Sequence, residues 1–285
     1  MPFSLLVVLA VLLAACTPSE DLPGASASAP RPDGSTLLGT VPYDLAQPDA
    51  RFALEPRLRE ISGLAWLDSG RLVAVQDEDG DLFELDPETG GVLRVTRFYN
   101  SGDYEGVALA DDVLWVVESD GDLYRYDGTD EAEKIDPGLK RSNDVEGLAY
   151  DAAQNRLLLA LKGDPGNDLE DVRAIYAFDL ASGRLFPEPA YTLDRERLDS
   201  GADSFKPSGL AIHPETDEIY IISADLRALI VLIPEGELQA AVALPVRLYP
   251  QPEGIAFAPD GTLFLSNEGG SGAATLLRFS PQPSP

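Results

Sequence analysis

The chain has 285 residues, and its 49 Asp and Glu against 21 Lys and Arg give a formal net charge of -28 at pH 7. Such a charge repels the phosphates of nucleic acids, which excludes DNA and RNA as expected partners, and it attracts divalent cations wherever carboxylates converge. Hydrophobic residues make up 44% of the chain, which is enough for a sizeable core.

The chain begins with a segment that has the features of an export signal. Residues 3–13 are apolar, a run that is too short to span a bilayer comfortably and has the length of a signal peptide. The sequence LAAC at residues 13–16 resembles a bacterial lipobox, which implies that residues 1–15 are a lipoprotein signal peptide and that Cys16 becomes the lipidated first residue. The alternative is a plain secretory signal followed by an incidental cysteine. Cys16 is the only cysteine, so no disulfide can form within the chain.

The resemblance to a lipobox also implies a location. A lipid on Cys16 would anchor the protein to a membrane of the cell envelope, facing the periplasm or the exterior. Thr17, at the position where Asp has a sorting role in Gram-negative lipoproteins, favours the outer membrane. Residues 16–36 are rich in Pro, Ala, Ser and Gly, which predicts a flexible tether. Residues 37–285 are the predicted folded domain.

The folded domain repeats one short pattern five times: Ser or Glu, then Gly, an apolar residue, Ala and an apolar residue. The copies are SGLAW at 62–66, EGVAL at 105–109, EGLAY at 146–150, SGLAI at 208–212 and EGIAF at 253–257. Their glycines, 63, 106, 147, 209 and 254, are 43, 41, 62 and 45 residues apart. A period of 40–45 residues with strand-like content is typical of a β-propeller with one four-stranded blade per repeat, and the longest interval carries an insertion.

The runs between the glycines support this architecture. Each repeat continues with short alternating or apolar runs separated by turns such as Asp-Gly and Ser-Gly, which predict antiparallel hairpins. The last repeat has three such runs, and residues 37–54 precede the first repeat and can supply the fourth strand. A ring closed in this way has no open sheet edge. We therefore predict an all-β fold, a β-propeller of five four-stranded blades closed by an N-terminal strand, with six blades as the alternative.

The residue before each repeated glycine is the first candidate for function, because the first strand of every blade lines the central channel. These residues are Ser62, Glu105, Glu146, Ser208 and Glu253. Three glutamates in a narrow ring repel one another, so either protons or a cation must neutralise them. Asp103 and Asp144 lie two residues earlier in their repeats and add acid.

The donor types indicate which cation this ring would bind. A set of oxygen ligands without nearby His or Cys favours Ca²⁺ or Mg²⁺ over Zn²⁺. We therefore predict a metal site formed by Glu105, Glu146, Glu253 and Asp144, with Ca²⁺ as the expected cofactor. Two alternatives remain open: each glutamate could cap a neighbouring blade through backbone N–H groups or a buried Arg, or one glutamate could be catalytic.

Further polar residues are expected around this ring. The loops after the second strands carry acidic side chains, and with two ring serines they form the predicted ligand-binding set: Ser62, Ser208, Asp77, Glu118, Asp225 and Glu268. The alternative for the acidic members is that they are solvated turn residues. His213 follows an inner strand and precedes Pro214, so we interpret it as a turn residue and not as a base or a ligand.

The ordered set REISGLAW, DYEGVAL, DVEGLAYDAAQNRLLLALKGDP, KPSGLAIHPETDEIYIIS and QPEGIAFAPDGTLFLSNE, over about residues 57–280, resembles the SdiA-regulated (YjiK-like) family. The resemblance implies a propeller exported to the cell envelope and often lipid-anchored. There is a weaker resemblance to esterase-like phytases and gluconolactonase-type propellers, which hold a divalent metal at the channel mouth. Lys162 departs from that pattern, because such relatives would have an acidic residue there, and it could pair with the glutamates.

Two functions agree with these features. The first is a binding or scaffold module that binds Ca²⁺ at the channel mouth and an envelope protein or a small ligand through its loops. The sequence contains no Ser-His-Asp triad, Cys nucleophile, P-loop or dinucleotide motif, so we assign no catalytic residue. The second is a metal-dependent hydrolase of an ester, lactone or phosphoester, in which Ca²⁺ polarises the substrate and Glu105, Glu146 or Glu253 acts as base.

Overall fold

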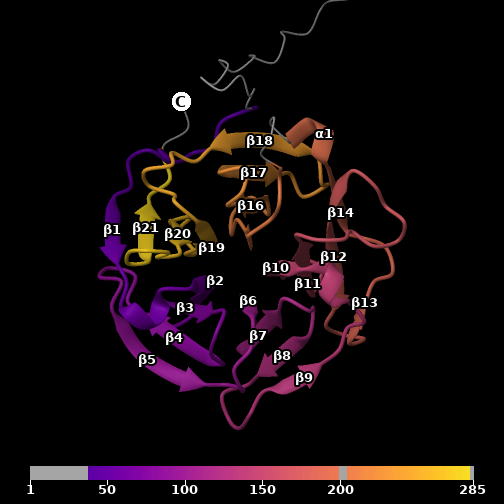
Figure 1. Ribbon diagram of the computed structural model, residues 1–285, viewed down its shortest axis with the longest axis horizontal. Coiled ribbons are helices and arrows are strands. Elements are labelled where there is room, and N and C mark those ends of the chain that lie inside the picture. The colour runs from indigo at the N-terminus through magenta and orange to yellow at the C-terminus, as the bar shows by residue number, and fades with distance from the viewer. Residues whose placement is uncertain (1–37, 199–203, 283–285) are drawn as a thin grey trace, which may run out of the picture.

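The computed structural model describes residues 38–198 and 204–282, which form a ring of antiparallel sheets around a central axis (Figure 1). The sheets number five in the described residues, so the predicted five-bladed β-propeller is confirmed. The predicted signal peptide, Cys16 and the tether lie outside the described residues.

The blades are numbered along the chain, and their strands are given from the axis outwards. Blade 1 consists of β2 (Ile61–Leu67), β3 (Arg71–Gln76), β4 (Asp81–Leu85) and β5 (Val92–Arg97). Blade 2 consists of β6 (Tyr104–Ala110), β7 (Val113–Glu118), β8 (Leu123–Tyr126) and β9 (Glu133–Ile135). Blade 3 consists of β10 (Val145–Asp151), β11 (Arg156–Leu161), β12 (Val172–Asp179) and, both paired with β12, β13 (Arg184–Leu185) and β14 (Tyr191–Asp194). Blade 4 consists of β15 (Gly209–Ile212), β16 (Ile219–Ser223), β17 (Ala228–Leu232) and β18 (Leu238–Ala243).

Blade 5 closes the ring with strands from both ends of the described chain. It contains β19 (Pro252–Phe257), β20 (Leu263–Asn267) and β21 (Thr275–Phe279), and its outermost strand is β1 (Ala50–Ala53). β1 pairs antiparallel with β21, as the sequence predicts for the segment before the first repeat. The helical elements are short: two 3-10 turns, Pro56–Leu58 and Arg141–Asn143, and α1 (Arg195–Leu198). Closure through β1 ties the start of the described domain to its end.

The core lies between neighbouring blades and is made of the inward faces of their strands. Between blades 4 and 5 the rings of Tyr220 and Phe257 meet edge to face, with centroids 4.9 Å apart. His213 belongs to this core, since it is buried, packs 4.9 Å from the Phe257 ring and lies in hydrogen-bond contact with the Tyr43 hydroxyl at 3.2 Å. Burial lowers the pKa of His213, which favours the neutral ring, and the side chain packs in the core at the start of the turn that the sequence predicts.

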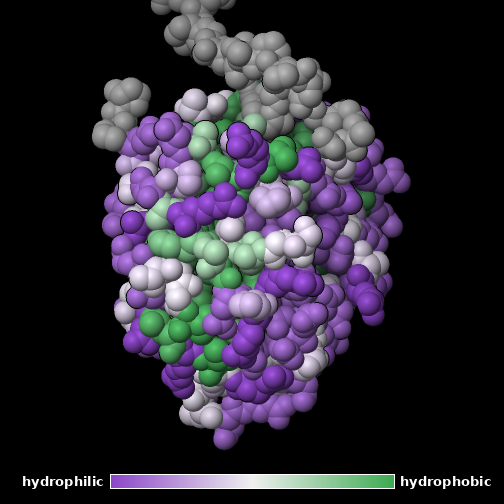
Figure 2. All heavy atoms as spheres, turned by 60° about the vertical axis from the view of Figure 1, so that its left-hand side comes forward, coloured by the Kyte–Doolittle hydropathy of each residue, from purple (hydrophilic) through white to green (hydrophobic). Residues whose placement is uncertain are grey.

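The surface reflects the excess of acidic residues. Figure 2 brings the side of the ring near β1 forward, and hydrophilic residues cover most of it, with smaller apolar areas between them. Exposed large apolar side chains are scattered over several elements: Leu38, Leu93, Phe186 and Val246. Single exposed apolar residues of this kind are normal on soluble domains, so they do not by themselves mark an interface.

At the axis the inner strands contact each other directly. A methyl group added to Gly63 would lie only 2.7 Å from the Cα of Gly106, so these backbones can approach only where side chains are absent. The space left at the level of the five glycines is about 10 Å³. The channel is therefore closed in the middle and has two separate ends: one is apolar, with a space of about 160 Å³ beside Trp66 and Phe257, and the other carries the acidic residues.

We predict that Gly63→Ala destabilises the propeller. The new methyl group meets backbone atoms of blade 2, which cannot rotate away, so the free energy of unfolding should fall by about 1–3 kcal/mol, the usual range for overpacking. Urea denaturation measures this change. Gly272→Ala is the control, because its new methyl would have its nearest neighbour at 3.6 Å and should change stability by less than about 0.5 kcal/mol. Equal stability of the two variants would contradict the close contact at the axis.

Candidate functional site

The acidic end of the channel, here called the mouth, is built from three sets of equivalent residues. The inner ring consists of the residues before the repeated glycines: Ser62, Glu105, Glu146, Ser208 and Glu253. The outer ring lies two residues earlier in each repeat: Glu60, Asp103, Asp144, Lys206 and Gln251. The third set follows the second strand of each blade: Asp77, Ser119, Lys162, Ala224 and Glu268.

Backbone hydrogen bonds hold the third set against the outer ring. The N–H groups of Ser119, Lys162 and Glu268 donate to the carbonyl oxygens of the outer-ring residues in their own blades, at 2.9, 2.7 and 3.0 Å. In blade 1 the corresponding bond, from Asp77 to Glu60, is longer at 3.4 Å. Side chains distant in sequence are therefore positioned by one repeated backbone arrangement.

The inner ring is largely satisfied by its own neighbours. The Ser62 hydroxyl donates to a carboxylate oxygen of Glu105 at 2.5 Å, and the Ser208 hydroxyl donates to the Pro252 carbonyl at 2.7 Å. Glu146, which is 6% exposed, receives a hydrogen bond from Lys162 Nζ at 2.8 Å. Lys162, the residue that departs from the acidic pattern, is thus a counter-ion inside the mouth.

Raised pKa values lower the remaining negative charge of the inner ring. Burial and the Glu146 carboxylate raise the pKa of Glu105 to about 9, although the Ser62 hydrogen bond opposes the shift. Burial, followed by the charges of Glu146 and Glu268, raises the pKa of Glu253 well above its usual value. Burial also raises the pKa of Glu146, while Lys162 lowers it. Protons and one lysine therefore oppose the build-up of charge that the sequence pattern indicates.

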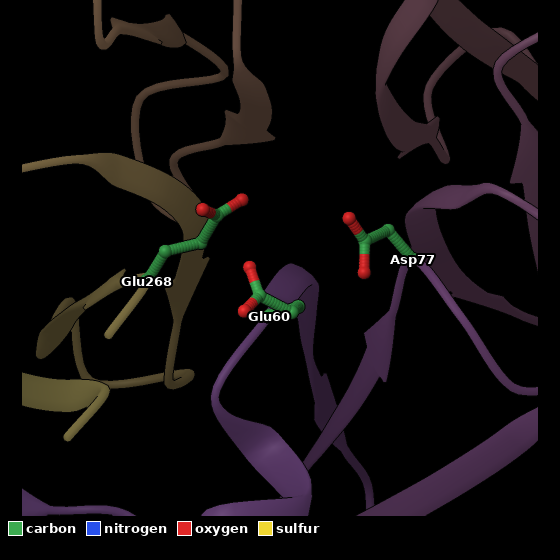
Figure 3. Close-up of side chains that lie close together, drawn as sticks. All are labelled: Glu60, Asp77 and Glu268. Atoms are coloured by element: carbon green, nitrogen blue, oxygen red, sulfur yellow. The ribbon is translucent and has the colours of Figure 1, made fainter. Parts of the chain in front are cut away.

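Another part of the mouth brings three carboxylates together from two blades. Among the described residues, three groups offer oxygens that all lie within 4.8 Å of one another: Glu60, Asp77 and Glu268. We call them the mouth cluster. Glu60 precedes β2, Asp77 follows β3 and Glu268 follows β20, and Figure 3 shows their carboxylates pointing toward one another across the boundary of blades 1 and 5.

The three carboxyl groups of the mouth cluster repel one another when they are ionised. Burial and the charge of Glu60 raise the pKa of Asp77 to about 6, and the same causes raise the pKa of Glu268 to about 7. Asp77 Oδ1 is buried and has no hydrogen-bond partner within residues 38–198 and 204–282. The other two carboxylates each have one neutralising or donating neighbour: Arg59 at 2.9 Å from Glu60, and the Gln251 amide at 2.5 Å from Glu268. This arrangement leaves oxygens available to a further positive group.

A second acidic group differs in this respect. Glu118, Asp120 and Asp122 on blade 2 also bring their oxygens within 4.8 Å of one another. Lys134 already lies among them, with its ammonium 2.5 Å from Asp122 and 3.6 Å from Glu118. Glu118 also accepts a hydrogen bond from the Tyr124 hydroxyl. A lysine thus occupies the place that a cation would take, so the mouth cluster is the better candidate for a metal.

The structure distributes the sequence-predicted residues over different roles. Asp77 and Glu268, predicted as ligand-binding residues, join the mouth cluster, while Glu118 faces the outer strands of its own blade. Asp225 forms an ion pair with Lys206 at 2.8 Å. Asp144, predicted as a metal ligand, adopts a left-handed backbone conformation (φ 54°), and its carbonyl accepts the Lys162 N–H.

Glu60 is the site residue that the sequence reasoning missed. It lies three residues before Gly63, the same position that Asp103 and Asp144 occupy before their glycines. Reading this position in every repeat would have found it, because equivalent positions in a propeller converge. Its repeat has Ser62 in the inner ring, so attention to the glutamates alone passed over it.

Three carboxylates without His or Cys make a hard donor set, which suits Ca²⁺ or Mg²⁺. The orphaned Asp77 Oδ1 fits such a cation, because a bound ion would satisfy a buried oxygen that otherwise raises the free energy of the folded state. The residues present therefore fit a divalent cation held by Glu60, Asp77 and Glu268.

The fold and the mouth define a class, the five-bladed β-propellers with acidic residues at one end of a closed channel. The sequence model of one family, SdiA-regulated, matches residues 48–270. The chain belongs to the SdiA-regulated family, as the sequence resemblance indicates.

Solved structures of three enzymes share the fold at low sequence identity. They are glutaminyl cyclase of Myxococcus xanthus (15% identity, 82% of this chain and 94% of that chain, TM-score 0.59), a gluconolactonase of Xanthomonas campestris (15%, 77% and 72%, 0.52) and the PQQ-bound aldose sugar dehydrogenase of Streptomyces coelicolor (16%, 82% and 97%, 0.51). At this identity the likeness concerns the fold alone.

In the described part of this chain, no helix has both the length and the apolar character needed to cross a membrane.

We predict that Glu105→Gln reduces the loss of stability at high pH. In the folded protein Glu105 keeps its proton up to about pH 9, whereas the unfolded chain releases it near the ordinary value of 4.5. Between these values the unfolded state binds fewer protons, so wild-type stability falls as the pH rises. The charges that face Glu105 are those of Asp103, Glu146 and Glu253, and each of them favours its protonated form.

Urea denaturation between about pH 5 and pH 9, in EDTA, measures this dependence. The variant should lose less stability than the wild type, by an amount on the order of 1–2 kcal/mol, because Glu105 is partly exposed and solvent screens the effect. Glu131→Gln, at an exposed loop position, should follow the wild-type curve. Parallel curves for Glu105→Gln and the wild type would contradict the raised pKa.

Proposed function

We propose that this protein is an envelope-anchored lipoprotein whose propeller binds a divalent cation, Ca²⁺ in particular, at the mouth cluster, and uses the mouth to bind a small ligand or an envelope protein. The observation that carries the proposal is the convergence of Glu60, Asp77 and Glu268, with an Asp77 oxygen that has no partner in the described protein.

Charge balance supports a cation at this place. Two like charges about 4 Å apart repel by roughly 4 kcal/mol at an effective dielectric constant of 20, and the mouth cluster contains three such groups. A divalent cation replaces these repulsions by attractions. The inner ring does not need one to the same extent, because Lys162 pairs with Glu146 and the pKa values of Glu105 and Glu253 are raised.

The position of the ligands favours Ca²⁺ over Mg²⁺. The three carboxylates come from separate loops on blades 1 and 5, so their arrangement is irregular. Ca²⁺ accepts six to eight oxygens in flexible geometry, whereas Mg²⁺ requires a near-ideal octahedron and keeps several waters. Water and a bound ligand would supply the oxygens that the cluster does not.

A metal-dependent hydrolase is the second candidate, and Glu253 is the observation that favours it. This carboxyl group is 7% exposed, its pKa is raised well above the usual value, and the charge of Glu268 contributes to that shift. A protonated acid beside a cation can act as a general acid on an ester or a lactone. Turnover of an ester and lactone panel that is abolished by Glu253→Gln would support this candidate, and no turnover with any of them would leave the binding function.

We predict that Ca²⁺ binds one site on the full chain and stabilises it. At a hundred times its dissociation constant, a one-site ligand adds about 2.7 kcal/mol to the free energy of unfolding, which thermal melting detects. Asp77→Asn removes one carboxylate charge at nearly constant shape, and calorimetric titration should show at least about tenfold weaker Ca²⁺ binding. Asp122→Asn, in the cluster that contains Lys134, is the matched control and should bind Ca²⁺ like the wild type. Loss of binding in the control alone would move the site to blade 2 and refute this assignment.

We predict that Cys16→Ser abolishes lipidation and membrane attachment. The wild-type chain, expressed in a Gram-negative host, should incorporate a labelled fatty acid and sediment with the outer membrane, since Thr17 follows the cysteine. The variant should incorporate no label and leave the membrane fraction. Ser19→Ala, three residues further along, is the control and should remain labelled. Labelled Cys16→Ser protein would contradict the lipobox interpretation.

A further inference from the structure

The mouth opens on one side into a pocket of about 600 Å³ that spans blades 3, 4 and 5. Three cationic side chains line it: Lys162, Lys206 and Arg227. In a chain with a net charge of -28, this is a local gathering of positive charge in a part of the mouth next to the mouth cluster. Positively charged groups gathered in a concave, polar site indicate an anionic ligand.

Two donor atoms of residues that line the pocket have no hydrogen-bond partner in the part of the chain that the structure describes. Arg227 Nε and Ser204 Oγ are both buried atoms without a hydrogen-bond partner among the described residues. A buried donor left unpaired costs free energy, and native proteins satisfy nearly all such groups. Both donors belong to residues that line the pocket, so unpaired hydrogen-bonding capacity lies close to any acceptor that is bound there.

The backbone holds Arg227 in an uncommon conformation. Arg227 lies in the turn between β16 and β17 with φ at +49°, a left-handed value that is uncommon for residues other than Gly, Asn and Asp. Its N–H donates to the Ala224 carbonyl and its own carbonyl accepts from Leu244 N–H at 2.8 Å, so both sides of the residue are fixed. Residues held in such conformations concentrate at ligand sites.

The two lysines keep donors free for a ligand. Lys206 pairs with Asp225 at 2.8 Å, but both side chains are largely exposed, and such exposed pairs contribute little energy. The Lys162 ammonium uses one donor for Glu146 and has three in all. Neither existing pair prevents the lysines from contacting an anion.

We propose that this pocket binds the carboxylate group of a small, hydroxyl-rich molecule, with Arg227 and Lys206 holding the carboxylate. Arg presents parallel N–H groups that match the two oxygens of a carboxylate. The rest of the wall is polar and includes Ser208 and Gln251, which suits hydroxyl groups on the body of the ligand. A singly charged carboxylate fits better than a doubly charged phosphate, because the Asp225 carboxylate also lines the pocket and repels additional negative charge.

The pocket lies beside the proposed cation without depending on it. Gln251 lines the pocket and donates to Glu268 of the mouth cluster at 2.5 Å, so the two sites share a wall. The proposal goes beyond cation binding, because the side chains that hold the carboxylate, Arg227 and Lys206, belong to blade 4 and not to the mouth cluster. It is therefore tested on protein from which metal has been removed by chelation and then dialysis, so that failure of the cation site cannot affect the result and no chelator carboxylates compete for the pocket.

Calorimetric titration of the full chain with gluconate, sorbitol and inorganic phosphate tests the proposal. Gluconate and sorbitol are both six-carbon polyols, and only gluconate has a carboxylate. We expect one gluconate site, no heat from sorbitol and weaker binding of phosphate than of gluconate. Binding of sorbitol as tight as that of gluconate, tighter binding of phosphate, or no heat from gluconate would overturn the assignment.

Variants of the cationic side chains locate the site. Arg227→Gln and Lys206→Gln should each weaken gluconate binding at least about tenfold, and Arg227→Lys should not restore it, because an ammonium lacks the planar pair of donors. Arg94→Gln, in the outer strand of blade 1, is the control and should bind gluconate like the wild type. Circular dichroism and an unchanged Ca²⁺ titration would show that the variants are folded. Folded variants that bind gluconate as the wild type does would overturn the proposal.

Discussion

The close approach of the inner strands at the axis is the constraint on which the structure depends. Gly63 and Gly106 lie so near each other that a single added methyl group would collide with backbone. This contact fixes the radius of the ring, and the radius decides how far apart the residues before the glycines lie. Groups that are far apart in sequence therefore interact: the charges of Glu146 and Glu253 both raise the pKa of Glu105. The arrangement of charges at the mouth is a consequence of packing at the axis.

Negative charge in the mouth has an internal counter-ion on blade 3, but only partly on blades 1 and 5. Around blades 1 and 5 the carboxylates of Glu60, Asp77 and Glu268 face one another, and their oxygens are available to a cation from solution. On blade 3 the protein supplies its own, since Lys162 pairs with Glu146. Partial burial strengthens both arrangements, because charges that are removed from water are less screened. The backbone repeats from blade to blade, but the charged side chains at the mouth are distributed unevenly around the axis.

The sequence was sufficient for the fold because its information is periodic. The spacing of the five glycines predicted five blades, and the missing run in the last repeat predicted closure by the segment that contains β1. The same periodicity placed Asp77 and Glu268 near the mouth, and it contained Glu60 as well. Which carboxylates come within reach of each other depends on side-chain conformations and on the loops of two blades, and the repeat pattern alone does not specify these.

The cationic pocket was beyond prediction for a different physical reason. Lys206 occupies the outer-ring position of its repeat, but Arg227 lies in a turn, and its contribution depends on a left-handed backbone that positions its side chain toward the pocket. Nothing in the repeat period indicates such a conformation, because the turn sequence differs from blade to blade.

The repeats thus share the inner strand that builds the ring and differ at the three positions around the mouth. These positions lie outside the glycine contacts at the axis, so the charge at the mouth differs from blade to blade while the axial packing is shared. Blades 1 and 5 carry the acidic side chains of the mouth cluster, and blades 3 and 4 carry the cationic side chains of the pocket. Opposite charges in neighbouring parts of one opening suit a ligand that is anionic at one end and coordinates a cation at the other.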